Sequence, residues 1–319
     1  MKKAIRFSIA VCLFSWAMAA VAHWGFGMGA DTPQRLLRFC MLYMFFPMLT
    51  AIVLQAIDKE KFNHTGLVSF KVSWPWLVAW LLPVVMTLAC IFVNGLMPGV
   101  ELQYNAEQLI SQYQVPEEQQ ELVREALAKM PAVLMIISTV FSGMIAGITI
   151  NAIAAFGEEY GWRNYLVGAL REQKFWKAAL FIGFVWGIWH FPLILMGHNY
   201  PNEPYWGVFM MVVFCILVGI IELYFVLKSK SMVVAAIMHG TINAVAGLTI
   251  YFTQGGNDFL NGMTGLAGFI VMVVAILCIW IYDKHIAKDN ICSMTLDEAL
   301  VVPEPVEGPR PETNKERGS

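Results

Sequence analysis

The chain is organised around the stretch Gly157-Glu158-Glu159-Tyr160-Gly161-Trp162-Arg163, which places two adjacent carboxylates and a guanidinium inside a long apolar region. A charged side chain in the middle of a membrane costs about 2.5 kcal/mol or more on insertion scales. Three such groups so close together indicate a functional site, and a structural ion cluster near a helix end is the alternative. Other polar groups also lie in apolar runs, namely His190 and the pair His239 and Asn243.

The composition is that of a polytopic membrane protein. Of the 319 residues, 58% are hydrophobic and only 14% are charged, whereas a soluble domain has about 25% charged residues. No basic patch indicates nucleic-acid binding. The six cysteines lack metal-ligand spacing, so we interpret them as small buried apolar residues without a disulfide framework. The fold class expected is therefore an all-α bundle of transmembrane helices with a polar cavity.

Eight apolar segments are long enough to span a membrane, which takes about 20 residues each. The fourth is expected to continue past the two glutamates to about residue 169. The first has a second interpretation, because it ends Ala20-Val21-Ala22, which resembles a signal peptidase site. The segments are residues 4–24, 36–57, 76–98, 132–157, 175–196, 206–228, 232–252 and 263–282.

Positive charges predict the orientation of these spans. If the N-terminus is cytoplasmic, most of the 21 Lys and Arg residues fall on the cytoplasmic side, and the exceptions are Arg35, Arg38, Arg124 and Lys129. Because cytoplasmic loops of membrane proteins are enriched in Lys and Arg, we expect both termini to be cytoplasmic. The expected location is a bacterial plasma (inner) membrane.

The chain divides into three parts. Residues 1–130 hold three spans and a long outer loop, residues 131–292 hold the remaining spans, and residues 293–319 are Pro-rich and charged, which predicts a disordered cytoplasmic tail. In the outer loop, Pro116-Glu117-Glu118 resembles a helix start. A short amphipathic helix on the outer surface is expected there, either as a plain connector or as a lid.

Helical spacing separates the two glutamates. Glu159 and Arg163 are four residues apart and share a face, so they are expected to pair. Glu158 is five residues from Arg163 and points elsewhere, which leaves its carboxylate free to act as a general base. Glu222 lies six residues before Lys228, and we expect it to snorkel or pair near the cytoplasmic surface.

The histidines and Asn243 suggest a second chemical element. His239 and Asn243 are also four residues apart, so imidazole and amide could donate two hydrogen bonds to one oxygen, as in an oxyanion hole. At 1.5 Å per residue, the expected depths of Glu158, His190 and His239 overlap. His190 is alternatively an interhelical hydrogen bonder, and Asn151 is expected to pack on the same face as Glu158.

These motifs resemble a known family. Glu-Glu-x-x-x-Arg, then aromatic-x-x-x-His, then His-x-x-x-Asn on successive membrane helices is similar to the CPBP family. The family comprises CAAX prenyl protease type II and bacteriocin-processing intramembrane proteases, also called Abi or lysostaphin resistance protein A-like. The resemblance covers about residues 130–250. Trp186 stands where the second motif usually begins with Phe, which puts the shape of the cavity in doubt.

The resemblance implies roles for the residues. Glu158 would activate water with help from His190, His239 and Asn243 would stabilise the oxyanion, and Glu159 and Arg163 would be the supporting pair. No cofactor is assigned, and the alternative is one divalent metal such as zinc held by Glu158, His190 and His239. Asn243 favours the metal-free version, because its amide is a poor zinc ligand.

The resulting hypothesis is an intramembrane endopeptidase. Its partners would be the lipid bilayer and a membrane-associated peptide or protein, either CAAX-like or a peptide precursor, and not nucleic acid. The first alternative is a non-proteolytic membrane scaffold or bacteriocin-immunity protein of the same fold. A proton-coupled transporter is favoured only by the intramembrane carboxylates.

Overall fold

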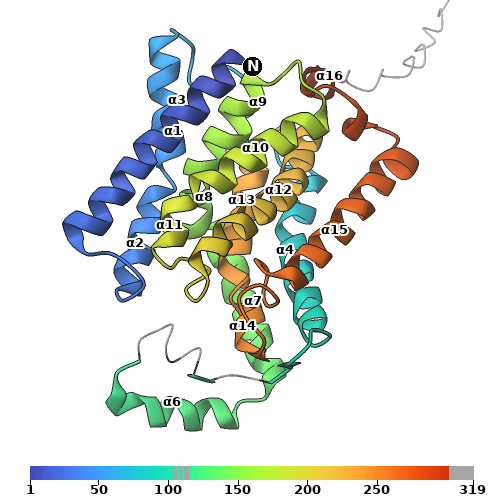
Figure 1. Cartoon of the computed structure of the whole chain (residues 1–319). Helices are drawn as coiled ribbons and strands as arrows, with labels where there is room; N and C mark the ends of the chain where they lie inside the picture. Colours follow the sequence, from blue (N-terminus) through green and yellow to red (C-terminus); the bar gives the residue numbers. More distant parts are fainter. Residues whose placement is uncertain (104–105, 108–109, 111–114, 302–319) are drawn as a thin grey trace, which may run out of the picture.

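The structure is a computed structural model, and it describes residues 1–103, 106–107, 110 and 115–301. Within these ranges the chain is a helical bundle (Figure 1) with one small antiparallel pair of strands, β1 (Val100–Glu101) and β2 (Gln254–Gly255). The helices are α1 (Lys2–Ala20), α2 (Pro33–Tyr43), α3 (Phe46–Ile57), α4 (Trp74–Asn94), α6 (Glu117–Lys129), α7 (Ala132–Ile148), α8 (Ile150–Glu159), α9 (Leu166–Ala169), α10 (Phe175–Trp189), α11 (Phe191–Leu195), α12 (Pro204–Ser229), α13 (Val233–Val245), α14 (Leu248–Tyr251), α15 (Leu266–Ile281) and α16 (Leu296–Val301).

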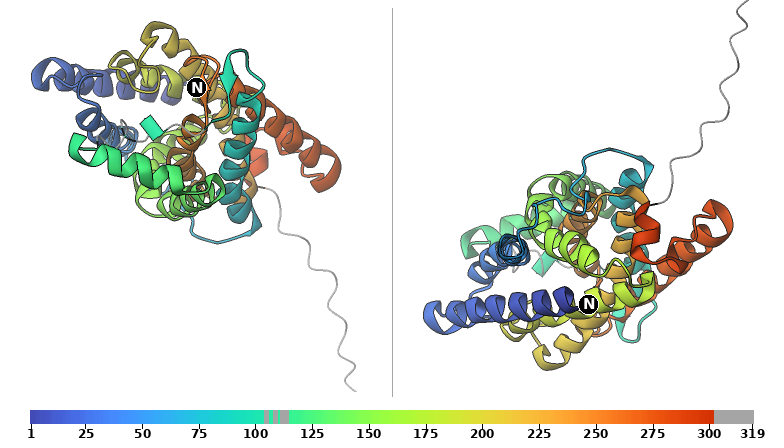
Figure 2. Two further views of the ribbon diagram at one scale, coloured as in Figure 1. Left: turned by 90° about the horizontal axis from the view of Figure 1, so that it is seen from below. Right: turned by 90° about the horizontal axis from the view of Figure 1, so that it is seen from above.

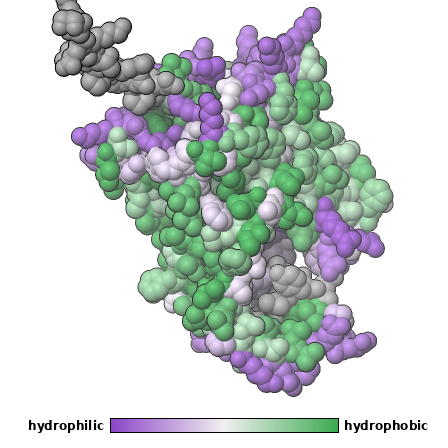
Figure 3. Space-filling view, turned by 180° about the vertical axis from the view of Figure 1, so that it is seen from behind, coloured by the Kyte–Doolittle hydropathy of each residue, from purple (hydrophilic) through white to green (hydrophobic). Residues whose placement is uncertain are grey.

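The helices confirm an integral membrane protein. Among the described residues, six helices are long and apolar enough to cross a membrane, and the bent pair α6 and α7 makes up to seven. Figure 3 shows hydrophobic side chains over most of the middle of one face, with hydrophilic side chains gathered toward its upper and lower ends. This distribution matches a bundle whose middle lies in hydrocarbon and whose ends lie in water.

The expected count of eight long spans is corrected to six or seven. The predicted fourth span is broken at Thr149, which has φ −117° and ψ −104° and separates α7 from α8. Its continuation is confirmed, because a π-helical turn (Tyr160–Tyr165) and α9 carry the helix on to Ala169. The predicted fifth span ends after the 15 residues of α10, since Pro192, near the start of α11, has no N–H to continue the hydrogen bonds of α10 and its ring would clash with the carbonyl four residues earlier.

The predicted outer helix is α6, which begins at Glu117, directly after Pro116, as the sequence predicts. The axes of α6 and α7 are bent by 108°. Figure 1 shows α6 lying at the end of the bundle opposite the N-terminus. This position agrees with an outer surface helix if the N-terminus is cytoplasmic, and it leaves both the connector and the lid interpretations open.

The prediction of a disordered tail from residue 293 is wrong for its first part. The chain forms α16, whose Leu296 and Ala299 are buried. Backbone amides tie this segment to the loop before α10: Phe175 N–H donates to Met294 O at 2.9 Å, and Leu296 N–H donates to Gln173 O at 3.0 Å. The rest of the predicted tail, residues 302–319, lies outside the described residues.

The interior is built around α13, which packs against α4, α7, α8 and α12, while α10 packs along α12. Seen along the bundle, α1 and α15 lie on opposite sides (Figure 2). The glycine at the start of the central motif is required for this packing, since a Cβ at Gly157 would lie 2.7 Å from Met44 O. The close approach presses the end of α8 against the junction of α2 and α3 and places both glutamates in the interior.

Candidate active site

Four membrane helices and one π-helical turn supply the polar groups of the site. Each of the groups that define it is buried, except that His190 is half-buried. They are Glu158 and Glu159 at the end of α8, Arg163 on the π-helical turn, Trp186 on α10 and His190 directly after it, Glu222 on α12, and His239 on α13.

The predicted pair of Glu159 and Arg163 is confirmed. Arg163 Nη1 lies 3.1 Å from Glu159 Oε1, and both side chains are completely buried. Their spacing of four residues keeps them on one face. Both charges are therefore compensated inside the bundle rather than by water.

Glu222 lies where the sequence did not lead us to expect it. Its side chain is completely buried and forms an ion pair with Arg163 Nη2, while Lys228 instead pairs with Asp289. The prediction of a cytoplasmic contact is wrong, because six residues on a helix correspond to about 120° of separation, so the two side chains leave different faces. That angle was the available signal that Glu222 faces the interior.

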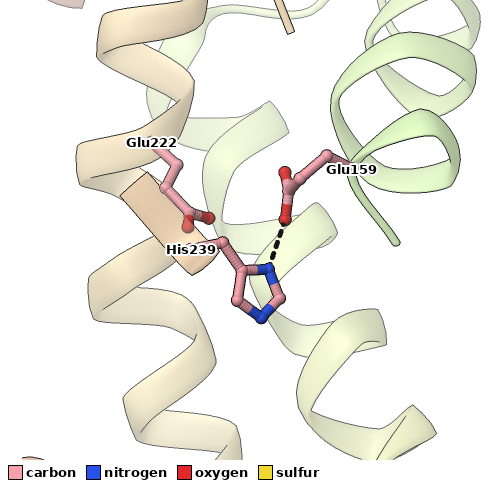
Figure 4. Close-up of side chains that lie close together, drawn as sticks. All are labelled: Glu159, Glu222 and His239. Carbon is pink, nitrogen blue, oxygen red and sulfur yellow. Dashed lines mark hydrogen bonds and ion pairs between the residues drawn. The ribbon is translucent and has the colours of Figure 1, made fainter. Parts of the chain in front are cut away.

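His239 is oriented by the same carboxylate. Its Nδ1 lies 2.9 Å from Glu159 Oε1, and because an ionised carboxylate can only accept, the ring donates its Nδ1–H. Figure 4 shows Glu159 and Glu222 with their acid groups turned toward the His239 ring. The Nε2 atom of His239 is therefore the one left for another partner.

Glu158 faces away from Arg163, as the spacing predicts. Its Oε2 accepts hydrogen bonds from the indole N–H of Trp186 at 2.6 Å and of Trp162 at 3.4 Å. Its Oε1 has no hydrogen bond to another described residue. The Trp186 ring also lies 4.4 Å from Arg163 Cζ and 5.3 Å from the His239 ring, so one indole links the two halves of the motif.

His190 is held in one tautomer. Its Nδ1 lies 2.9 Å from Trp186 O and 3.7 Å from Cys215 Sγ. Because a carbonyl oxygen can only accept, Nδ1 carries the proton. The Nε2 atom of the neutral ring is then a hydrogen-bond acceptor.

The two asparagines behave differently from the charged groups. Asn243 follows His239 by one turn of α13 and is exposed. Asn151 donates a hydrogen bond to Gly240 O at 3.3 Å, which is a packing contact between α8 and α13. The structure thus gathers Glu158, Glu159, Arg163 and His239 tightly and leaves His190 and Asn243 more accessible.

One group of side chains has the ligand types and spacing of a divalent-metal site. The ligand atoms of Glu159, Glu222 and His239 lie within 4.8 Å of one another, so by type and distance the group could hold a metal ion. Within the described part of the chain this group shares only His239 with the predicted zinc ligands Glu158, His190 and His239. The difference arises because Glu158 is turned toward the indoles.

Comparisons with known proteins agree with the motifs. Residues 138–245 match the profile of the Rce1-like type II CAAX prenyl endopeptidases, and this region contains all three motifs. A protein named CAAX prenyl protease 2 from Methanococcus maripaludis is 33% identical over 138 residues, which make up 41% of this chain and 48% of the relative. The chain is therefore matched over about half the length of that relative.

Proposed function

We propose, from the match of residues 138–245 to the Rce1-like type II CAAX prenyl endopeptidases, that this chain is an intramembrane endopeptidase. It hydrolyses a peptide bond in a membrane-associated substrate, either a CAAX-like C-terminus or a peptide precursor. The observation that carries the proposal is Glu158, a buried carboxylate that is held by two indole N–H groups and not by Arg163. A carboxylate without an ion-pair partner next to it can accept a proton from water.

Glu158 acts as the general base. Both indoles donate to Oε2, so Oε1 can bind the water. As the water attacks the carbonyl carbon of the scissile bond, its proton moves to Glu158, and the carbonyl oxygen becomes an oxyanion. Proton transfer to a positioned carboxylate contributes roughly 10²- to 10⁴-fold to a rate.

His239 and Asn243 stabilise the oxyanion. Since Glu159 accepts the Nδ1–H of His239, the doubly protonated ring can donate its Nε2–H to the substrate oxygen, and Glu159 compensates the charge. The amide of Asn243, one turn further along α13, supplies a second donor. Loss of one such donor typically costs roughly 10²- to 10³-fold in kcat.

His190 assists the proton transfers. Its Nδ1–H is committed to the Trp186 carbonyl, so Nε2 can accept a proton from Glu158 and pass it to the leaving nitrogen. The C–N bond then breaks, and the products are a carboxylic acid and an amine. Glu158 and His190 return to their starting protonation states.

We propose that Glu159, Glu222 and His239 form a charge-compensation network around Arg163 rather than a metal site. Three oxygens, Glu159 Oε2 and both oxygens of Glu222, lack hydrogen bonds within the described residues, but Arg163 forms ion pairs with Glu159 Oε1 and Glu222 Oε2. The guanidinium of Arg163 thus already supplies the positive charge that a cation would otherwise bring to these carboxylates. No step of the proposed reaction therefore passes through a metal.

The membrane placement follows the charge bias of the sequence. With the N-terminus in the cytoplasm, the end of the bundle that carries α9 and α16 faces the cytoplasm, and the site lies between this end and the bundle centre. We propose a plasma-membrane enzyme whose substrate reaches the site from the cytoplasm or from the bilayer. Enclosing the water in the bundle restricts hydrolysis to such substrates.

The test is peptide cleavage by the purified protein in lipid. A panel of labelled peptides, prenylated and unprenylated, is incubated with wild type, Glu158→Ala and His239→Ala, each with and without a chelator. We expect wild-type cleavage that resists the chelator, and a loss of at least about 100-fold in both variants. Glu118→Ala, which changes an exposed carboxylate on α6, is the matched control and should cleave normally.

Normal cleavage by Glu158→Ala would contradict the proposed mechanism. A second outcome is that wild type cleaves no peptide of the panel, while a variant without Glu158 and His239 still folds and still complements a strain that lacks the protein. That outcome would favour a membrane scaffold or immunity protein over a protease. Loss of cleavage with chelator alone would show that a metal takes part.

A further inference from the structure

The site contains more buried carboxylates than the motif supplies. The family-type motif supplies Glu158, Glu159 and Arg163, and α12 adds a third carboxylate, Glu222, with a completely buried side chain. A buried carboxylate is costly unless it is paired. The position of Glu222 therefore needs an explanation in terms of what it does to Arg163.

Arg163 lies between two carboxylates from different helices. Nη1 contacts Glu159 Oε1 at 3.1 Å, and Nη2 forms an ion pair with Glu222 Oε2. The backbone of α12 passes close to the guanidinium, because a Cβ at Gly219, three residues before Glu222, would lie in van der Waals contact with Nη2 at 3.4 Å. Both terminal nitrogens of the planar guanidinium thus face a carboxylate, Nη1 through a hydrogen bond and Nη2 through an ion pair.

The Glu222 carboxylate affects how the Arg163 guanidinium is oriented on Glu159. Without it, both guanidinium nitrogens could turn to Glu159, since Arg and carboxylate prefer a bidentate pair. Glu159 Oε1 is shared, because it lies 3.1 Å from Arg163 Nη1 and 2.9 Å from His239 Nδ1, so a guanidinium that turned to bind Oε2 as well would change the geometry at the oxygen that orients His239. By attracting Nη2, Glu222 keeps Arg163 in the orientation in which this oxygen is shared with His239.

The same clamp supports Glu158. The guanidinium lies over the Trp186 ring, with Cζ 4.4 Å from the ring centroid, and the indole of Trp186 donates to Glu158. A shift of Arg163 would therefore change the packing of the Trp186 ring, and with it the position of the N–H that binds Glu158. Through this one guanidinium, Glu222 acts on both the base and the oxyanion donor.

We propose that Glu222 is a positioning residue for peptide hydrolysis, which clamps Arg163 between two carboxylates and thereby fixes Glu159 on His239 and Trp186 on Glu158. The proposal rests on the proposed function for its catalytic consequence. The interaction of Glu222 on α12 with Arg163 on the π-helical turn does not depend on activity, so it can be tested separately. Arg163 then provides the permanent positive charge of the site.

The kinetic test compares Glu222→Gln with wild type on a peptide that wild type cleaves. Gln keeps the size of the side chain and removes its charge. We expect kcat to fall by about 10- to 100-fold, as for other residues that orient catalytic groups, while KM stays within about twofold because Glu222 does not touch the substrate. Glu118→Gln on exposed α6 is the control, and an unchanged kcat in Glu222→Gln would overturn the catalytic part.

The structural test does not depend on activity. Melting temperatures in detergent are measured for wild type, Glu222→Gln, Arg163→Met and the double variant. If Glu222 clamps Arg163, Glu222→Gln lowers the melting temperature of wild type but raises it in the Arg163→Met background, where Glu222 is an uncompensated buried carboxylate. Equal shifts in both backgrounds would overturn the clamp, and failure of wild type to cleave would count only against the proposed function.

Discussion

Two networks of charged side chains in this molecule use the same chemistry in opposite surroundings. At the end of the bundle near the N-terminus, Lys3 and Arg6 of α1 pair with Asp58 and Glu60 after α3, and the two basic side chains are 43% to 50% exposed. In the interior, Arg163 pairs with Glu159 and Glu222, and all three are completely buried.

The difference in burial between the two networks shows where charged side chains can hold other side chains in place. Water and salt weaken the exposed pairs, whose removal typically changes stability little. The buried network has no water to replace a lost partner, so each member constrains the others strongly. Only the buried network is suited to holding His239 and Trp186 in fixed positions.

The largest effect on stability is expected for Arg163→Met. It leaves Glu159 and Glu222 facing each other without a counter-ion, and breaking a buried pair typically costs about 3–5 kcal/mol. Chemical unfolding of the purified protein measures the loss. Arg6→Met is the matched surface change and should produce roughly a tenth of that effect; equal losses would mean that burial does not distinguish the two networks.

An intermediate effect is expected for Trp186→Phe, which keeps a ring under Arg163 but removes the N–H that binds Glu158 at 2.6 Å. A hydrogen bond to a charged group contributes about 1.5–3 kcal/mol to stability, so we expect the melting temperature to fall, and kcat to fall by roughly tenfold or more because the base is no longer held. Trp162→Phe removes the longer bond of 3.4 Å and should have the smaller effect. The reverse order would show that Trp186 does not hold Glu158.

The smallest effect is expected at the surface and depends on pH. The Arg6 guanidinium hydrogen-bonded to Asp58 holds the pKa of that carboxyl below its ordinary value. A lowered folded-state pKa stabilises the fold above the unfolded-state pKa, and this stabilisation is lost as pH falls through the folded-state value. Melting curves of wild type and Asp58→Asn should therefore differ slightly at neutral pH and converge below about pH 4; a gap that widens in acid would contradict this sign.

The spacing of residues along one helix was sufficient to predict how the side chains of the Glu158-Glu159…Arg163 motif are oriented. Helix geometry predicts that Glu159 and Arg163 share a face and that Glu158 faces away from Arg163, and both are present in the structure. The continuation of α8 through the π-helical turn to Ala169 was also predictable, because the residues after the glutamates remain largely apolar.

What the sequence concealed depends on contacts between distant segments. Glu222 meets Arg163 only because α12 packs beside the π-helical turn, and no local pattern records that neighbour. The break at Thr149 lies in an uninterrupted apolar run without Pro. Docking of Leu296 and Ala299 was masked by the Pro-rich residues that follow, so the tail was predicted to begin too early.

The most direct test of the account uses the two adjacent glutamates. Glu158→Gln and Glu159→Gln change neighbouring, equally buried carboxylates, and cleavage and melting temperature are measured for both. The account predicts that Glu158→Gln abolishes cleavage without lowering the melting temperature, because Glu158 is the base, whereas Glu159→Gln lowers the melting temperature because Arg163 and His239 lose their shared partner. Full cleavage by Glu158→Gln, or identical behaviour of the two variants, would contradict the division between a working and a supporting carboxylate.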